Sequence, residues 1–427
     1  MKNILLFVVT TLLYCFPCSS QIIGEEISVM VSPDHADWNY KLGEKCTFTV
    51  RVLKANNLLP DVVIDYELGP EMYTVDKKTG VKLKDGKINL TGKMNTPGFF
   101  ICKVKAIVNG RTYEGLANAA YEPEKLKPVT EMPEDFTSFW IECIRKAREI
   151  PLDYRMKLLP ERCTETVNAY EVSFQNNRYG SRIYGILTIP VEEGKYPALL
   201  RVPGAGVRPY QGDTYLASKG VIVLEIGIHG VSVTKEQQLY DDLQNGPLNG
   251  YWTFNAHDRY NCYYNRVITG VIRSVDFIED LPQFNHEQLG ITGASQGGAL
   301  SIIGAALDSR ITFYASIHPA LCDHSAFLKK RAGGWPHYLY YDNSPSDELI
   351  KTLQYYDTAN FAAMLKVPGW VSFGYNDVVC PPTSVYSAYN VITSPKEIHT
   401  YLQTGHFWYK EQYEEWNNWL LKMLNVK

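Results

Sequence analysis

One short segment constrains the fold of this chain more than any other, namely Gly293-Ala294-Ser295-Gln296-Gly297-Gly298. Apolar residues precede it at Leu289 and Ile291, and a run rich in alanine and isoleucine follows it over residues 298–307. This pattern predicts a strand that ends in a sharp turn, lifts a serine above the edge of a sheet and continues as a helix. Glycines on both sides of the serine remove side chains that would clash in such a turn. The segment therefore predicts that Ser295 is a nucleophile on an α/β sheet.

The rest of residues 135–427 repeats the same alternation of strand and helix. Residues 221–226 are almost continuously apolar, as in a strand covered on both faces. We expect strands at 183–189, 198–202, 221–226, 288–292, 370–373 and 398–402, and helices at 135–149, 267–277, 298–307 and 409–424. This order predicts a mostly parallel sheet with helices on its faces.

Residues 21–120 have a different, β-rich pattern. Runs at 27–31, 46–52, 62–68, 87–90 and 99–108 are separated by turn signals such as Asn109-Gly110. Short strands at this spacing predict an immunoglobulin-like β-sandwich, although other small β folds fit too. Residues 121–134, which contain three prolines, are the predicted linker to the catalytic part.

Two of the nine cysteines fall on strands of the predicted sandwich. Cys46 lies on an early strand and Cys102 on a late one, where a sandwich often places a pair between its sheets. In an exported protein such a pair forms a disulfide, whereas buried cysteines also persist as free thiols. The sequence leaves both states open.

The first 20 residues predict a signal peptide. Lys2 precedes a short apolar run at 4–13, and small residues at 18–20 suit a cleavage site. We therefore expect export to the periplasm or the extracellular space, without an integral membrane span. A lipid anchor on Cys15 or Cys18 is less expected, because bulky residues precede both.

Charge and motif content exclude several classes of protein. The 42 basic and 46 acidic residues nearly balance, which gives no reason to expect a nucleic-acid partner. No HExxH, Walker or dinucleotide motif occurs, and no cysteine pair has metal-ligand spacing. We therefore expect no metal and no cofactor.

A serine on such a turn needs an acid and a histidine, in that order along the chain. Asp377 follows the predicted strand 370–373, and His406 follows the strand 398–402. Both positions lie at carboxyl ends of strands, where open α/β sheets collect their functional groups. His399 lies inside a predicted strand and is expected to be structural. Ser295, Asp377 and His406 therefore predict the catalytic triad of an α/β-hydrolase fold.

The predicted reaction also needs two donors for a developing oxyanion. The backbone N–H of Gln296 begins the helix after the serine, and the second donor should come from the loop after an earlier strand. That loop is Pro203-Gly204-Ala205-Gly206, so we expect the backbone N–H of Ala205 to serve. Glu225 and His229 are nearby candidates for which packing is the preferred interpretation.

Four segments resemble one known family. They are 293–298, 395–398 (Pro-Lys-Glu-Ile), 132–136 (Met-Pro-Glu-Asp-Phe) and, the most specific, 374–390, which reads Gly-Tyr-Asn-Asp-Val-Val-Cys-Pro-Pro-Thr-Ser-Val-Tyr-Ser-Ala-Tyr-Asn. Over residues 130–427 the chain is similar to the acetyl xylan esterase and cephalosporin-C deacetylase family. The resemblance implies removal of acetyl groups from xylo-oligosaccharides and other small acetylated compounds without a metal. It also implies Ser295, Asp377 and His406 as the triad.

The chain departs from that family in two places. The β-rich part is not in the basic family pattern, so the family's oligomerisation need not carry over and a homo-oligomer stays open. The family has a tyrosine where this chain has Ala205.

The sequence thus predicts a secreted serine esterase for acetylated oligosaccharides. The alternatives are a prolyl-oligopeptidase-like serine peptidase and a non-catalytic carbohydrate-binding protein, although a complete triad argues against the latter. We also expect residues 21–120 to fold independently and to be dispensable for the chemistry.

Overall fold

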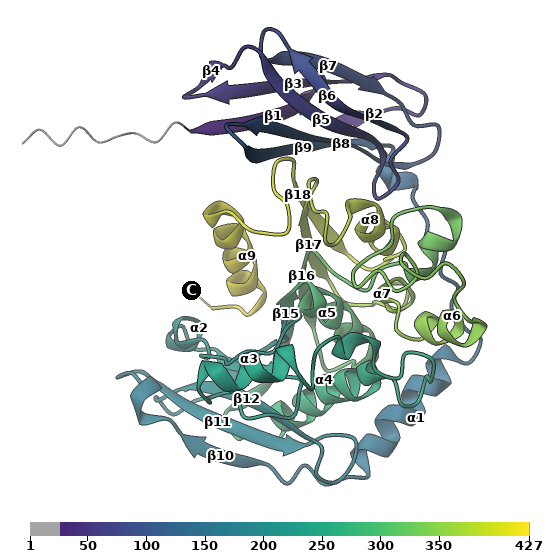
Figure 1. Cartoon of the computed structure of the whole chain (residues 1–427). Helices are drawn as coiled ribbons and strands as arrows, with labels where there is room; N and C mark the ends of the chain where they lie inside the picture. Colours follow the sequence, from purple (N-terminus) through teal and green to yellow (C-terminus); the bar gives the residue numbers. More distant parts are fainter. Residues whose placement is uncertain (1–25, 427) are drawn as a thin grey trace, which may run out of the picture.

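The computed structural model describes residues 26–426, so the predicted signal peptide at 1–20 lies outside the described residues. A β-sandwich forms one end of the molecule, and a sheet covered by helices forms the other (Figure 1). The strand and helix bounds below follow this division.

The sandwich contains two sheets, whose strands are mostly antiparallel. One has the order β1-β3-β4 with β7 paired to β3, and the other has the order β2-β9-β8-β5-β6. Alternate residues of β3 are buried, as the period of two of a half-buried strand requires. The bounds are β1 Ile27–Pro33, β2 Asn39–Tyr40, β3 Cys46–Lys54, β4 Asn57–Leu58, β5 Val62–Pro70, β6 Asp76–Leu83, β7 Lys87–Gly92, β8 Gly98–Val108 and β9 Arg111–Tyr121. The five expected strands are present; β2, β4, β6 and β9 were not expected.

Cys46 and Cys102 lie in different sheets of the sandwich, in β3 and β8. Both are buried free thiols. Burial raises the pKa of Cys46 to about 12 and raises that of Cys102 as well. Of the two states that the sequence left open, the structure contains the free thiols.

The second part is built on a nine-stranded sheet with the order β10-β11-β12-β14-β13-β15-β16-β17-β18. Strands β13 to β18 pair in parallel, while β10, β11 and β12 form an antiparallel edge. The bounds are β10 Arg155–Leu158, β11 Val167–Gln175, β12 Arg182–Pro190, β13 Tyr196–Arg201, β14 Ile222–Gly227, β15 Phe284–Ala294, β16 Phe313–Ile317, β17 Gly369–Gly374 and β18 Lys396–Tyr401. The mostly parallel sheet is as predicted, and β10, β11 and β16 are additional to the expected strands.

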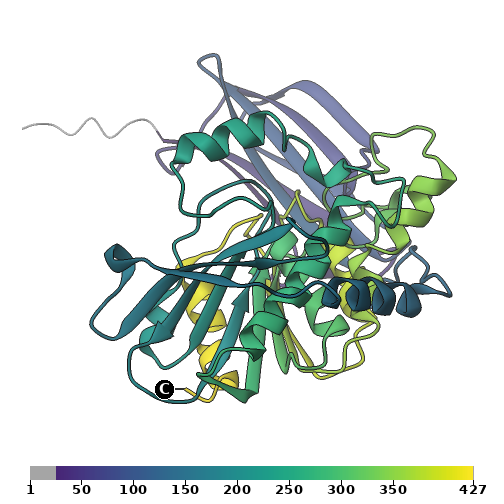
Figure 2. The same cartoon turned by 90° about the horizontal axis from the view of Figure 1, so that it is seen from below.

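Helices cover both faces of this sheet (Figures 1 and 2). Leu199 and Val223 face α2 and α9, whereas their chain neighbours Leu200 and Leu224 face the side of α4 and α5. Because neighbouring strand residues point to opposite faces, apolar pairs such as Leu199-Leu200 are buried on both. The bounds are α1 Phe136–Arg148, α2 Thr214–Ser218, α3 Gln237–Asn245, α4 Tyr263–Glu279, α5 Gln296–Leu307, α6 Asp347–Gln354, α7 Thr358–Ala362, α8 Pro382–Asn390 and α9 Lys410–Met423.

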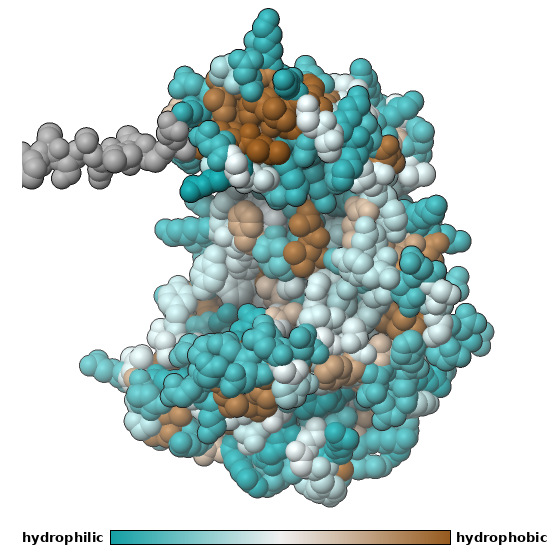
Figure 3. Space-filling model, in the orientation of Figure 1, coloured by the Kyte–Doolittle hydropathy of each residue, from teal (hydrophilic) through white to brown (hydrophobic). Residues whose placement is uncertain are grey.

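The sandwich packs directly on the helix-covered sheet. Phe99 of β8 contacts Tyr375 and Tyr386 beyond β17, with ring centroids 5.0 and 5.8 Å apart. One hydrophobic cluster contains buried residues of both parts. Most of the face seen in Figure 3 is hydrophilic, with a hydrophobic patch on the sandwich. Among the described residues, no helix has the length and apolar character to cross a membrane.

Candidate active site

Ser295 occupies a sharp turn between β15 and α5. Its backbone has φ 60° and ψ −121°, a conformation that L-residues rarely adopt. The Ser295 N–H donates to the carbonyl of Ile317 at 2.9 Å, and the Ser295 carbonyl accepts from Ala320 at 3.0 Å. A Cβ at Gly293 or at Gly297 would lie 2.4 Å from the carbonyl oxygen of Val202. Because these two residues are glycines, the backbone that follows β13 can pack closely against the turn. This close packing holds Ser295 in its strained conformation.

Asp377 and His406 meet at the carboxyl edge of the same sheet. His406 Nδ1 lies 2.7 Å from Asp377 Oδ2. The other oxygen, Oδ1, accepts from the backbone N–H groups of Val379 and Cys380, at 2.8 Å each. Asp377 is fully buried, whereas His406 is partly exposed. These bonds fix the carboxylate, and the carboxylate in turn orients the imidazole with Nδ1 toward it.

The hydroxyl of Ser295 makes no hydrogen bond to His406 among the described residues; its side chain interacts with the thiol of Cys380 instead. In unliganded enzymes the bond from nucleophile to base is often long and tightens only with substrate. Burial raises the pKa of Cys380 well above its ordinary value, while the Ser295 side chain acts in the opposite direction. Cys380 is therefore a neutral neighbour of the serine, which the sequence did not indicate.

His318, at the end of β16, packs on His406 with ring centroids 4.2 Å apart. Burial, and secondarily His406, lower the pKa of His318 to about 3, so it stays neutral. His318, Asp377 and His406 offer three ligand atoms within 4.8 Å of one another. A metal there would compete with the His406–Asp377 bond and with the N–H groups that already occupy Asp377, so these residues suit a triad better than a metal site.

The two predicted oxyanion donors lie beside the turn. Gln296 is the first residue of α5, where backbone N–H groups have no partner within the helix. Ala205 is half-buried in the loop after β13. A Cβ on the preceding Gly204 would lie 4.0 Å from Ser295 Cβ. In the hydrogen bonds of the described residues, no protein acceptor takes the N–H of Gln296 or of Ala205. Both N–H groups are therefore available to a ligand.

The buried side chain of Gln296 connects the loop at 203–206 to the segment that contains Tyr251 and Tyr264. Its Oε1 accepts from the hydroxyls of Tyr251 at 2.6 Å and Tyr264 at 2.8 Å. Its Nε2 donates to the carbonyl of Pro203 at 3.2 Å. Neither tyrosine was singled out in the sequence, where they are two aromatic residues in a long polar, aromatic stretch at 236–264.

His229 and Glu225 support the loop rather than the reacting groups. His229 Nε2 lies 3.1 Å from the carbonyl oxygen of Gly206, and its Nδ1 lies 2.8 Å from the hydroxyl of Tyr263. Burial lowers the pKa of His229 to about 4, so its neutral form donates to Gly206 and accepts from Tyr263. Glu225 accepts from the N–H of Gly212 at 2.9 Å.

A cavity of about 350 Å³ lies next to this loop. Gly204 and Ala294, the neighbours of Ala205 and Ser295, are among its lining residues. Its other walls include the aromatic side chains Tyr210, Trp408, Tyr413 and Trp416. Aromatic faces of this kind suit the apolar faces of a sugar or an acyl group.

Comparisons with known proteins show the family to which the chain is similar. The family model described as acetyl xylan esterase matches residues 120–423. Acetyl esterase Axe7A of Xylanibacter ruminicola is 36% identical over 371 residues, which are 86% of this chain and 83% of that protein.

Two solved structures have the same fold. Acetyl xylan esterase from Paenibacillus sp. R4 is 25% identical with a TM-score of 0.62, over 70% of this chain and 98% of that chain. Acetyl xylan esterase 1 from Thermoanaerobacterium sp. JW/SL YS485 is 24% identical with a TM-score of 0.61, over 71% and 98%. They confirm the predicted α/β-hydrolase fold and the resemblance seen in the sequence. The chain belongs to the acetyl xylan esterase family.

Proposed function

We propose that this chain removes acetyl groups from acetylated xylo-oligosaccharides or similar carbohydrates through a covalent acyl-enzyme. As a member of its family it is a carboxylic ester hydrolase. The observation that carries the mechanism is the 2.7 Å contact of His406 Nδ1 with Asp377 Oδ2, at the sheet edge that also bears Ser295 on its strained turn.

The proposed reaction uses each of these groups in turn. His406 Nε2 takes the proton of the Ser295 hydroxyl as the serine oxygen attacks the acetyl carbonyl. The negative charge that develops on the carbonyl oxygen meets the N–H groups of Gln296 and Ala205. His406 then gives the proton to the departing sugar oxygen, which leaves the acetyl group on Ser295. Water then attacks that ester while His406 takes its proton, and His406 gives the proton to the Ser295 oxygen as the bond to the acetyl group breaks and acetate leaves.

Three further assignments remain proposals. We propose that residues 1–20 direct export, on the charge and apolar pattern of the sequence alone. We propose an immunoglobulin-like class for residues 21–120, which the two facing sheets at 27–121 support. We also propose that 121–134 are a linker and that 135–427 are the catalytic domain.

The substitution Ser295→Ala tests the mechanism. Acetate release from an aryl acetate and from acetylated xylo-oligosaccharides should fall by about 10⁴-fold or more, with an unchanged melting temperature. A variant that keeps a substantial share of activity contradicts the role of Ser295. Faster cleavage of a proline anilide than of either acetate by the wild-type protein would favour a peptidase. Carbohydrate binding without any hydrolysis would favour a non-catalytic protein.

A further inference from the structure

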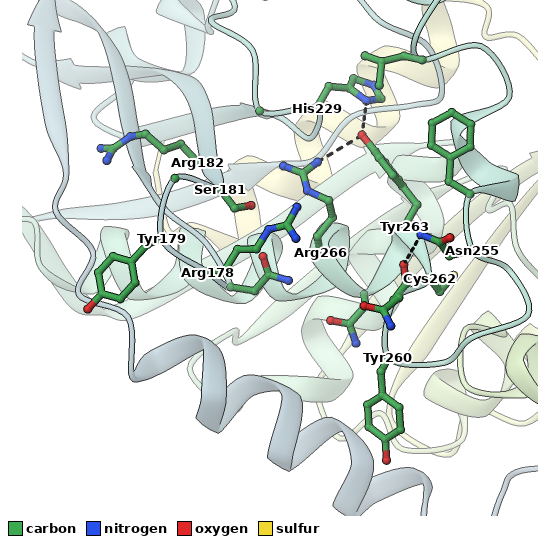
Figure 4. A pocket seen from close by; sticks show the side chains of 17 residues that line it. Arg178, Tyr179, Ser181, Arg182, His229, Asn255, Tyr260, Cys262, Tyr263 and Arg266 are labelled. Atoms are coloured by element: carbon green, nitrogen blue, oxygen red, sulfur yellow. Dashed lines mark hydrogen bonds between the residues drawn. The ribbon is translucent and has the colours of Figure 1, made fainter.

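A second cavity, of about 690 Å³, lies away from Ser295 and has no part in the reaction proposed above (Figure 4). Its walls are the turn between β11 and β12 at 177–182, the residues after β14 at 229–230, and several residues within 248–266. Asparagine side chains and backbone groups make much of the lining polar. No aspartate or glutamate is among the lining residues.

Two arginines give this cavity its charge. In Figure 4 the side chains of Arg178 and Arg266 extend toward the same space from different walls. Neither forms an ion pair with a described acidic residue. Arg266 contacts only neutral groups, the carbonyl of Ile228 and the hydroxyl of Tyr263, and Arg178 is exposed. A third arginine, Arg182, points away and is paired with Asp153 at 2.8 Å.

Two uncompensated guanidinium groups that face one space repel each other and attract an anion. A guanidinium presents a planar fork of donors that matches the two oxygens of a carboxylate. The amide of Asn177, whose Oδ1 has no hydrogen-bond partner among the described residues, can donate to and accept from hydroxyl groups at the cavity wall. A carboxylate on a molecule rich in hydroxyls, such as an acidic sugar, fits both features.

The position of the cavity connects it to the reaction. It lies at the same edge of the sheet as Ser295, and the strand order from Ser295 is β15, β13, β14, β12. Because β12 is antiparallel to β14, its start at Arg182 lies at this edge, and three strand spacings place it about 14 Å from the end of β15. His229 lines the cavity and also contacts Gly206, the neighbour of Ala205. His229 thus connects the wall of the cavity to the loop that bears Ala205, on the same edge of the sheet as Ser295.

We propose that this cavity binds the carboxylate of an acidic sugar that belongs to the same oligosaccharide as the acetyl ester at Ser295. The inference rests on the proposed function and narrows its substrate class to acetylated oligosaccharides that carry a uronic acid. Arg178 and Arg266 hold the carboxylate, and the cavity thereby selects the substrate without taking part in bond cleavage.

Arg178→Gln is the decisive variant, because Arg178 is exposed and its loss should not disturb the fold. Steady-state kinetics compare acetylated xylo-oligosaccharides with and without one glucuronic acid branch. We expect KM for the acidic substrate to rise about tenfold, with kcat nearly unchanged, since a charge-assisted hydrogen bond is lost. The KM values for the neutral oligosaccharide and for an aryl acetate should not change. Arg111→Gln, an equal change of charge on the exposed start of β9, is the matched control and should behave as wild type.

The same effect on acidic and neutral substrates, or none on either, overturns the proposal. A direct binding measurement tests the cavity independently of the proposed hydrolysis. Titration calorimetry on Ser295→Ala protein should detect the deacetylated, glucuronic-acid-bearing oligosaccharide, and the double variant with Arg178→Gln should bind it about tenfold more weakly. If no acetylated carbohydrate is hydrolysed, the proposed function fails while this titration still decides the cavity. Inorganic phosphate that binds as tightly as the acidic oligosaccharide would make the cavity a general anion site and would overturn the substrate assignment.

Discussion

Asn118, in β9 of the sandwich, donates a hydrogen bond from its Nδ2 to the backbone carbonyl of Tyr375 at 2.6 Å, two residues before Asp377. The Asn118 N–H also donates to Asn376 Oδ1 at 3.1 Å. A second sandwich residue, Glu71, accepts from the N–H of Thr383 at 3.1 Å and from Asn118 Nδ2 at 3.2 Å. Burial raises the pKa of Glu71 to about 8, so this carboxyl is largely neutral at pH 7. The sandwich therefore forms hydrogen bonds to the segment that carries Asp377, the acid of the proposed triad.

We predict that Asn118→Ala lowers kcat on an aryl acetate about tenfold, because a loose acid loop no longer holds the imidazole of His406 in place. KM should change little, since Asn118 contacts no substrate. The free energy of unfolding should also fall by about 1–3 kcal/mol, because Tyr375 and Glu71 lose a buried donor.

Asn89→Ala is the matched control, an exposed asparagine in β7 of the other sheet. It should leave both kcat and stability close to wild type. A normal kcat for Asn118→Ala, with only the melting temperature lowered, would mean that the contact joins the two parts without positioning Asp377.

These contacts also bear on whether residues 21–120 are dispensable, as the sequence suggests. We now expect a fragment that starts at residue 122 to lose most of its esterase activity. It would expose Tyr375, Tyr386 and the rest of the surface on which Phe99 packs. Activity of the soluble fragment on an aryl acetate, compared with that of the whole chain, is the measurement. Equal activity would restore the sequence-based expectation.

The parts of the fold that the sequence predicted are those with a local signal. Strand β14 is recognisable from its apolar run. The strand, turn and helix around Ser295 are recognisable from the spacing of the glycines. Strand β16 was missed because Phe313–Ile317 is only five residues long and mixes alanine, serine and tyrosine. Strand β6 was missed because its residues are mostly exposed and polar, so burial leaves no alternation to recognise.

The site follows the same division. Ser295, Asp377 and His406 were predicted from motif and chain order, and the structure brings the latter two into contact. Asn118 and Tyr251 act through contacts with residues far along the chain, and no local pattern marks such partners. Only the three-dimensional arrangement reveals that His318 lies against His406.

His324 predicts acid sensitivity of the fold. Its ring is buried against Tyr338, and neither nitrogen has a hydrogen-bond partner among the described residues. Burial, and secondarily His337, lower its pKa from 6.5 to about 3. Below pH 6.5 His324 becomes protonated in the unfolded chain but stays neutral in the folded chain. The free energy of unfolding therefore falls as the pH drops toward 3. From pH 6.5 to pH 4 this single group costs on the order of 3 kcal/mol.

We predict that His324→Phe reduces the loss of melting temperature between pH 7 and pH 4. The ring keeps its packing, while the proton-binding site in the unfolded state disappears. Thermal unfolding monitored by circular dichroism at both pH values is the measurement. His257→Phe, on an exposed histidine, should leave the pH dependence as in wild type. A wild-type pH dependence in His324→Phe would show that other buried groups, such as His229 and His318, account for it.

The resemblance seen in the sequence places Ala205 where the family has a tyrosine, and the contacts of its loop predict the effect of that difference. A backbone N–H is indifferent to the side chain that it carries, so the oxyanion contact survives the loss of a phenol ring. The loop conformation is set elsewhere, by His229 on Gly206 and by Gln244, whose Oε1 accepts from the N–H of Val207 at 2.9 Å. What alanine changes is the space beside the ester.

We therefore predict that Ala205→Tyr keeps hydrolysis of an aryl acetate within about tenfold, which corresponds to about 1.4 kcal/mol of crowding. Hydrolysis of a bulkier ester, such as an aryl butyrate, should fall by a larger factor, because filling a fitted site is costly. The ratio of kcat/KM for the two esters is the measurement, and Ala205→Ser is the control that adds almost no volume and should leave the ratio unchanged. Equal losses on acetate and butyrate in Ala205→Tyr would mean that residue 205 does not border the acyl group, and that its match to the family tyrosine is wrong.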